Sequence, residues 1–228
     1  MALAEVGSGS QRATSAAVDN GSSTTLAFPA NVTSGNLLVV MGGQTAGGAT
    51  VVTDTRSTSY TVYQSGAGVF IAVGVALSSG ACTVTVDPSA TADYSFSIDE
   101  FSGQAATPLD VDDGKTTGTD TAPTAGITTV AADTLILGCV SHSGATTTIA
   151  NNDGTQLGEV ETGGSVSEPH NAIFSIVSTQ GTYTIDWSLG ASRTWSVYLI
   201  SIAAPGAVGT ILGSPIFGDG VRVVTGMF

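Results

Sequence analysis

Short runs of alternating apolar and polar residues, separated by turn residues, predict β-strands along most of the chain. In the first half we expect strands at 24–28, 36–41, 50–54, 60–63, 69–77, 82–86 and 94–101. In the second half we expect them at 125–130, 134–140, 146–149, 156–161, 172–177, 182–187 and 195–202. The alternation is clearest in the run 94–101, which predicts an apolar inner face and an outer face with Ser97 and Asp99 in water.

The segment 80–103 recurs as 181–204 at a constant offset of 101 residues. The apolar positions of the two copies coincide without a gap, which predicts two related units with the same inward face. The matched pairs are Val84 with Ile185, Val86 with Trp187, Tyr94 with Trp195, Phe96 with Val197 and Ile98 with Leu199. By this alignment both tryptophans are core residues rather than surface residues that stack on sugars.

We therefore predict an all-β fold of two tandem antiparallel β-sandwich repeats, jelly-roll or Ig-like, with an extended N-terminal arm and a C-terminal tail. The expected boundaries are an arm at 1–22, a first repeat at 23–104, a linker at 105–121, a second repeat at 122–204 and an assembly tail at 205–228. The polar, Pro/Gly/Asp/Thr-rich composition of 105–121 indicates the linker. The arm is expected to pair with an edge strand or to reach a neighbour.

The outer face of the last strand differs between the copies. Tyr198 and Ile200 stand where the first copy has Ser97 and Asp99, so the strand 195–202 is apolar on both faces. Such a strand is normally covered on both sides. We expect Tyr198, Ile200 and Ile202 to lie at a domain or subunit interface, under the first repeat, the arm, the tail or another subunit.

The tail is apolar although glycines interrupt it, and in water it would promote aggregation. We expect it to pack either on its own chain or on a neighbouring copy. Its candidate interface residues are Ile216, Phe217, Val221, Val223, Met227 and Phe228.

Composition and charge narrow the function classes. The 228 residues carry 18 acids against 5 basic residues, a net charge of -13, which would repel nucleic acid and anionic membranes. No apolar run is long enough to span a membrane, and the first residues do not form a secretory signal. Cys82 and Cys139 lie in apolar runs, and we expect buried free thiols.

Candidate catalytic residues are few, and we predict neither an enzyme nor a cofactor. His142 and His170 are interpreted as surface or loop histidines, because no Gly-x-Ser-x-Gly elbow accompanies them. A glycosidase needs two carboxylates that flank a cleft, whereas the adjacent Asp99 and Glu100 diverge in a strand. The acids at 110, 112 and 113 lack the spacing of an EF-hand and indicate a solvated linker rather than a calcium site.

Two tyrosines, Tyr60 and Tyr63, remain as possible glycan contacts, since an exposed aromatic ring can stack on a sugar. This leaves open a carbohydrate-binding or host-adhesion module as an alternative function.

The segments SGNLLVVMGG, VVTDTRSTSYTVY, CTVTVD, DYSFSIDEFSG and TPLDV together resemble tandem β-sandwich modules of bacteriophage virion proteins and bacterial surface proteins. The second half keeps the pattern more faintly and lacks the Glu-Phe-Ser-Gly ending of Glu100–Gly103. The resemblance spans roughly residues 23 to 204. It implies a role in a virion, on the particle exterior or alternatively on a bacterial surface, and no catalytic residues.

The expected function is that of a non-enzymatic structural protein of a phage-like particle, a capsid decoration or a tail or fibre component. Its expected partners are other virion subunits, capsid or tail proteins, in a homo-oligomer or a lattice, and a glycan is an optional ligand. The terminal segments would anchor it, since arms that add to a neighbour's sheet gain affinity by multivalency.

Overall fold

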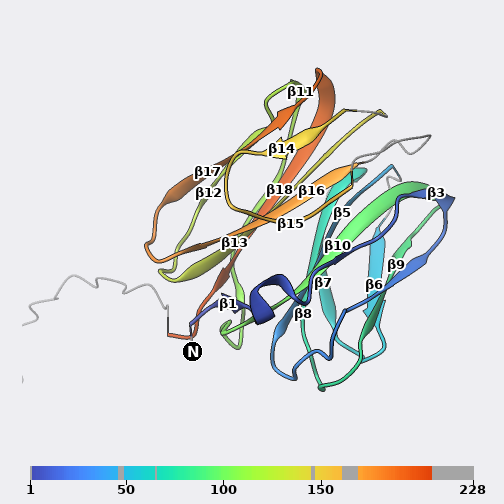
Figure 1. Cartoon of the computed structure of the whole chain (residues 1–228). Coiled ribbons are helices and arrows are strands. Elements are labelled where there is room, and N and C mark those ends of the chain that lie inside the picture. Colours follow the sequence, from blue (N-terminus) through green and yellow to red (C-terminus); the bar gives the residue numbers. More distant parts are fainter. Residues whose placement is uncertain (1, 46–48, 65, 145–146, 161–168, 207–228) are drawn as a thin grey trace, which may run out of the picture.

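The computed structural model describes residues 2–45, 49–64, 66–144, 147–160 and 169–206, and this part of the chain is all-β. Two β-sandwiches lie one on the other, so that their sheets form four layers (Figure 1). The predicted all-β fold of antiparallel sandwiches is confirmed. Within the described residues, no helix has the length and apolar character needed to span a bilayer.

The first repeat consists of β1 (Ala4–Glu5), a 3-10 turn η1 (Val6–Gly9), β2 (Ala13–Thr14), β3 (Val18–Gly21), β4 (Thr24–Ala27), β5 (Leu37–Gln44), β6 (Thr50–Asp54), β7 (Tyr60–Gln64), β8 (Gly68–Val75), β9 (Thr83–Pro88) and β10 (Ala92–Ser102). Its large sheet has the order β1-β10-β5-β8-β7, and β2 and β3 also pair with β10. Its small sheet has the order β4-β9-β6.

The second repeat consists of β11 (Leu109–Asp120), β12 (Thr124–Thr128), β13 (Thr134–His142), β14 (Ile149–Asn151), β15 (Thr155–Val160), β16 (His170–Val177), β17 (Thr182–Leu189) and β18 (Arg193–Ala203). The order β11-β18-β13-β16-β15 of its large sheet and the order β12-β17-β14 of its small sheet match those of the first repeat. The duplication therefore preserved the topology as well as the sequence pattern.

Each repeat has its own core between its two sheets. The matched inward positions are buried in both copies, with Phe96 in the first core and its counterpart Val197 in the second. Trp187 and Trp195 belong to the second core, as predicted. The exact offset of the apolar positions thus reflects two cores built on one plan.

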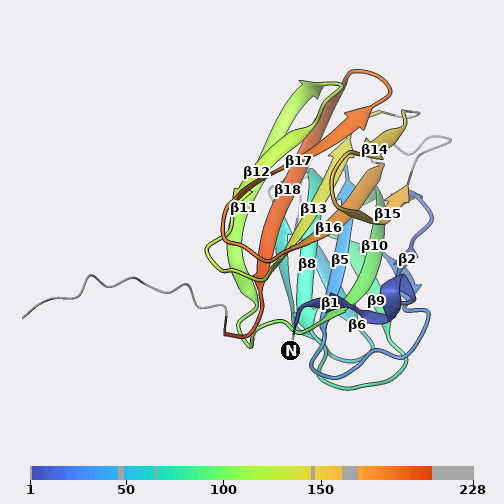
Figure 2. The same ribbon diagram turned by 60° about the vertical axis from the view of Figure 1, so that its left-hand side comes forward.

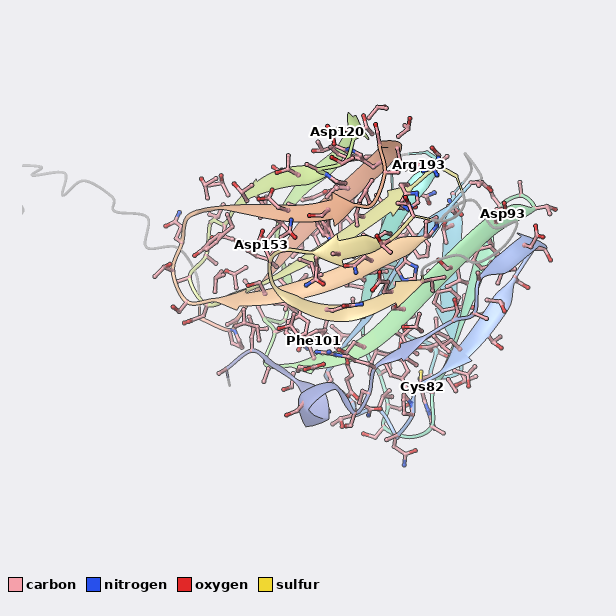
Figure 3. The ribbon with its side chains drawn as sticks, turned by 45° about the horizontal axis from the view of Figure 1, so that its top comes forward. Cys82, Asp93, Phe101, Asp120, Asp153 and Arg193 are labelled. Carbon is pink, nitrogen blue, oxygen red and sulfur yellow. The ribbon has the colours of Figure 1, made fainter. Side chains whose placement is uncertain are left out.

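A third apolar cluster, which we call the central cluster, lies between the large sheets of the two repeats. The strand order of one sheet runs opposite to that of the other across this interface, so that β10 faces β15 and β7 faces β11. Its members include Leu37, Val39, Met41, Ile71, Phe101, Leu135, Leu137, Phe174, Ile200 and Ile202. Figure 3 shows Phe101 where the arm and both repeats meet, and its ring packs edge-on against Phe174 at 5.0 Å.

The central cluster corrects one prediction. Ser97 and Asp99 were expected in water, yet both are fully buried, because the second repeat and the N-terminal arm cover this face of β10. Each fully buried Leu or Ile contributes roughly 1.5–3 kcal/mol by leaving water. That gain offsets the cost of enclosing a few polar groups, provided that they are hydrogen-bonded.

The leading segments of the two repeats occupy equivalent places. Thr14 of the arm opposes Ser97, and Lys115 opposes Tyr198; both members of the second pair follow those of the first by 101 residues (115 − 14 and 198 − 97). Residues 105–121 are therefore not simply a linker, as the sequence indicated, because most of them form β11. Figure 2 shows β11 beside β18, and the arm takes the corresponding place on β10.

Candidate functional site

An open groove lies at one side of the interface between the repeats, and we call this side the groove seam. It has a volume of about 380 Å3 and lies between β7, β8 with the turn after it, and the start of β11. Since β7 and β11 are the edge strands of the two large sheets, the groove is the open end of the central cluster. Its lining residues are Ser59, Thr61, Tyr63, Val73, Gly74, Val75, Leu77, Thr107, Pro108 and Leu109.

The surface of the groove is mainly apolar. Leu77 is 66% exposed and Leu109 is 37% exposed, while Tyr63 and Val75 pack against the central cluster. Burial, with a smaller contribution from Asp112, raises the pKa of Tyr63, so its hydroxyl stays protonated. None of these described lining residues is an acid, a histidine or a base, so the groove is suited to apolar side chains or a flat ring rather than to acid-base chemistry.

The last strand leaves the fold beside this groove. The N–H of Ala203 donates to the carbonyl of Pro108 at 2.8 Å, and the N–H of Ala105 donates to the carbonyl of Ala203 at 2.8 Å. The N–H of Ala204 then donates to the carbonyl of Asp133 at 3.0 Å. The point at which residues 205–228 begin is therefore fixed next to the groove wall.

The residues singled out from the sequence fall into three groups. Tyr198, Ile200 and Ile202 belong to the central cluster and are buried against the first repeat. The six tail residues, Ile216, Phe217, Val221, Val223, Met227 and Phe228, lie outside the described residues. The third group is the pair of tyrosines.

The structure separates the two tyrosines. Tyr63 lines the groove, whereas Tyr60 packs against the core of the first repeat and its hydroxyl donates to Asp54 Oδ2 at 3.0 Å. Burial and the adjacent Asp54 carboxylate raise the pKa of Tyr60. Only Tyr63 therefore has its ring in a place where a ligand in the groove would meet it.

The opposite side of the interface, which we call the arm seam, is closed by Glu5 and Arg12 of the arm and by Asp99 of β10. The Arg12 guanidinium donates to Glu5 and, at 3.2 Å, to Asp99 Oδ2. It also donates to the carbonyl of Gln156 at 2.6 Å and lies 5.2 Å from the ring centroid of Phe174. One side chain of the arm thus binds both repeats, through ionic, hydrogen-bond and cation–π contacts.

The carboxyl of Asp99 is fully buried in the arm seam. Loss of water raises its pKa, and a hydrogen bond with Glu5 raises it further, because two close carboxyl groups share a proton more easily than they bear two charges. Arg12 and the N–H of Glu100, which donates to Asp99 Oδ1 at 2.8 Å, act against this rise.

His170 lies in the same interface, at the start of β16, and is fully buried rather than in a surface loop. Its Nδ1 is 2.7 Å from Ser95 Oγ and its Nε2 is 2.8 Å from Ser97 Oγ. Burial lowers the pKa of His170 to about 3, so the ring is neutral at ordinary pH. A neutral imidazole has one donor and one acceptor nitrogen, and the two serine hydroxyls satisfy both.

His142, the other candidate base, is also buried, at the end of β13. It lines a smaller pocket of about 210 Å3, with Ser141, Ser143, Thr194 and Ser196 among the neighbouring side chains. Burial lowers its pKa, and its Nδ1 is 3.3 Å from the carbonyl of Ser143. None of the described lining residues of this pocket is a carboxylate that would orient the ring for catalysis.

The carboxylate of Glu100 is also held in place by hydrogen bonds. It accepts hydrogen bonds from Gln11 Nε2 at 2.9 Å, from the N–H of Thr33 at 2.8 Å and from Asn36 Nδ2 at 2.7 Å. Glu100 and Asp99 point to different groups of partners, and neither lines one of the two pockets described above. The pair that a glycosidase mechanism would need is therefore not assembled here.

Asp110 of the predicted linker fixes a turn. Its carboxylate accepts from the N–H groups of Val130 and Ala131, each at 3.1 Å, and from Ser201 Oγ at 3.0 Å. Within the described residues, no cluster of three or more His, Cys, Asp or Glu side chains is placed to hold a metal. Cys82 and Cys139 are free and buried, as expected.

Comparison of the chain with models of protein families, with curated proteins and with solved structures finds no match.

Proposed function

We propose that the chain is a non-enzymatic structural subunit of a phage-like particle, a capsid decoration or a tail or fibre component, exposed on the particle surface. The observation that carries this proposal is the central cluster, which joins two complete sandwiches through a fully buried apolar face. Such a block keeps its shape under load, because its repeats cannot separate without exposing that face.

The placement of the reactive residue types supports a structural role. His170 and Asp99 are enclosed in the interface between the repeats, and Glu100 accepts three hydrogen bonds. The negative charge of the chain favours solubility at the high local concentration of a particle surface. The arm pairs with its own β10, so anchoring to neighbours would fall mainly on the C-terminal tail.

Labelling of particles tests this proposal. Particles produced by the cells that encode the chain are purified by density-gradient sedimentation, probed with an antibody against the folded chain and imaged by electron microscopy. We expect the chain to sediment with intact particles and the antibody to decorate their exterior in a regular pattern. Recovery of the chain only from the particle-free fractions would contradict the proposal, and label confined to cell envelopes would favour a bacterial surface protein.

A carbohydrate-binding or host-adhesion module is the second candidate function, and the position of Tyr63 in the groove favours it. The hydroxyls of Ser59, Thr61 and Thr107 line the same groove and would bond to sugar hydroxyls. Binding to a glycan array should then be lost in Tyr63→Ala and kept in the matched control Tyr60→Phe, whose ring stays in the core. Equal binding by both variants would exclude the groove as the glycan site.

A further inference from the structure

At the groove seam, apolar side chains are exposed to water close to Ala203, the last residue of β18. Leu77 is among the few large apolar side chains of the described residues that are strongly exposed, and Leu109 faces the same hollow. Exposed apolar surface of this kind marks a binding site or an aggregation hazard. A segment with apolar side chains would remove the hazard by covering these two leucines.

The C-terminal segment begins close to the groove and is therefore the candidate to cover these two leucines. Ala203 is hydrogen-bonded to Pro108 in the groove wall, so residues 207–228 begin only a few residues from the groove. At up to about 3.4 Å per residue, the five residues from 207 to 211 can extend about 17 Å from this point. The first apolar pair that they bring is Ile211 and Leu212, followed by Ile216 and Phe217.

We propose that the groove at the β7–β11 edge is a docking site for the chain's own C-terminal segment, whose apolar side chains cover Leu77 and Leu109. The own segment is favoured over that of a second copy because its root is already fixed at the groove. Tethering of this kind gives an effective concentration in the millimolar range, well above that of free chains in dilute solution.

This inference concerns the isolated chain and does not depend on the proposed particle role. It is nevertheless compatible with anchoring, because a neighbour in an assembly presents the same groove to the same segment. The experiment below uses only the purified chain, so its failure and a failure of the particle labelling are distinguishable.

Thiol accessibility tests the docking. In the full-length chain Leu77→Cys places a thiol in the groove, and Val51→Cys, on β6 and 53% exposed, serves as the matched control. Cys82 and Cys139 are buried and should therefore react slowly. Each variant is also made with Ile211, Leu212, Ile216 and Phe217 replaced by serine, which keeps the full length of the chain.

We expect the thiol of Leu77→Cys to react with a thiol reagent at least tenfold more slowly when the tail is intact than when its apolar residues are serine. The thiol of Val51→Cys should react equally fast in both backgrounds. The protection should not change on dilution, and light scattering should give the mass of a monomer. Leu109→Cys provides a second probe of the same groove.

Equal reaction rates in the two tail backgrounds at both probes would show that the groove is open and would overturn the proposal. Protection that weakens on dilution, together with the mass of a dimer, would overturn it in favour of a second copy as the occupant. Protection that arises only when particles are added would overturn it in favour of a foreign partner.

Discussion

The two seams of the interface between the repeats use equivalent strand positions but differ in the side chains that cover them. Val73 of β8 and Phe174 of β16 are equivalent positions, 101 residues apart, and both belong to the central cluster. At the arm seam the Arg12 guanidinium lies over Phe174, and Arg12 also contacts Glu5 and Asp99. At the groove seam Val73 lines an open, apolar hollow.

The difference shows that one duplicated interface has one polar, closed end and one apolar, open end. The arm seam carries ion pairs and bonded histidine, which fix the register of the two sheets, since polar groups are satisfied in only one arrangement. At the groove seam Lys115 donates to the carbonyl of Ala67 at 2.6 Å in an exposed position, and the apolar groove is open to a ligand. The following five predictions separate the contributions of the cluster and the two seams.

The largest effect is expected from a charge in the middle of the central cluster. Ile200→Asp would bury a carboxylate among the apolar side chains of the central cluster, and we expect a loss of more than about 4 kcal/mol in the free energy of unfolding. Ile200→Val, the control, should cost about 1 kcal/mol. Urea denaturation followed by fluorescence measures both. Two well-separated transitions in the wild-type chain would show that the cluster does not couple the repeats.

The next effect is on acid stability. Because burial lowers the pKa of His170 from 6.5 to about 3, the unfolded chain binds a proton between these values that the folded chain does not. The stabilisation is complete above pH 6.5 and decreases as the pH falls toward 3, by on the order of 4 kcal/mol. His170→Gln, which keeps one donor and one acceptor, should flatten this part of the curve of unfolding free energy against pH.

Titration of Asp99 should change the free energy of unfolding with pH in the opposite direction, which provides an internal check. Its pKa is raised in the fold, so the folded chain holds a proton that the unfolded chain releases, and stability falls as the pH rises above the ordinary carboxyl range. Asp99→Asn should remove that decline on the neutral side and leave the acid side unchanged. An unchanged profile in both variants would mean that neither group titrates differently on folding.

A smaller loss is expected at the arm seam from Arg12→Ala, about 2–3 kcal/mol. The substitution leaves the carboxyl groups of Glu5 and Asp99 without their cation and uncovers Phe174. Thermal unfolding measures it. Arg12→Lys, which keeps the charge but not the fork of donors, should recover only part of the loss; full recovery would show that charge alone matters.

The smallest effect is expected from substitutions at Thr14 and Lys115, which are equivalent positions in the two seams. Thr14→Val removes a half-buried hydroxyl contact, at 3.0 Å, with the buried Ser97, and we expect a cost of about 1 kcal/mol. Lys115→Met removes a contact with the carbonyl of Ala67 at an exposed site and should cost about 0.5 kcal/mol or less. Equal costs at the two sites, measured by denaturation, would argue against the difference between the seams.

The sequence predicted the strands that bury one regular face, and the physical reason is local. In β10 and β18 the period-two pattern fixes the inward side chains, whatever covers the other face. The second face depends on tertiary contacts, so Ser97 and Asp99 were predicted in water although the second repeat and the arm enclose them. Local polarity does not reveal a partner that arrives from elsewhere in the chain.

The alternation of apolar and polar residues did not predict the edge strand β11, the contacts of Arg12 or the groove. β11 pairs with β18 on one side only and many of its side chains are exposed, so its Thr, Asp and Gly residues have the composition of a linker. Arg12 carries no local signal, and only its scarcity, as one of 5 basic residues, distinguishes it. The groove depends on how two edges meet across an interface, which no single segment encodes.

The opposed strand order of the two large sheets has a consequence for how far the duplication can be extended. The packing of the two large sheets reproduces, within one chain, the isologous interface of a two-fold symmetric dimer. In such an interface both units use the same face, so the face of each is fully occupied by the other. In the described residues each large sheet is already covered by the other, so a further copy of this repeat could not join through the same face. The two repeats therefore form a closed pair rather than a stack in which each repeat contacts two neighbours.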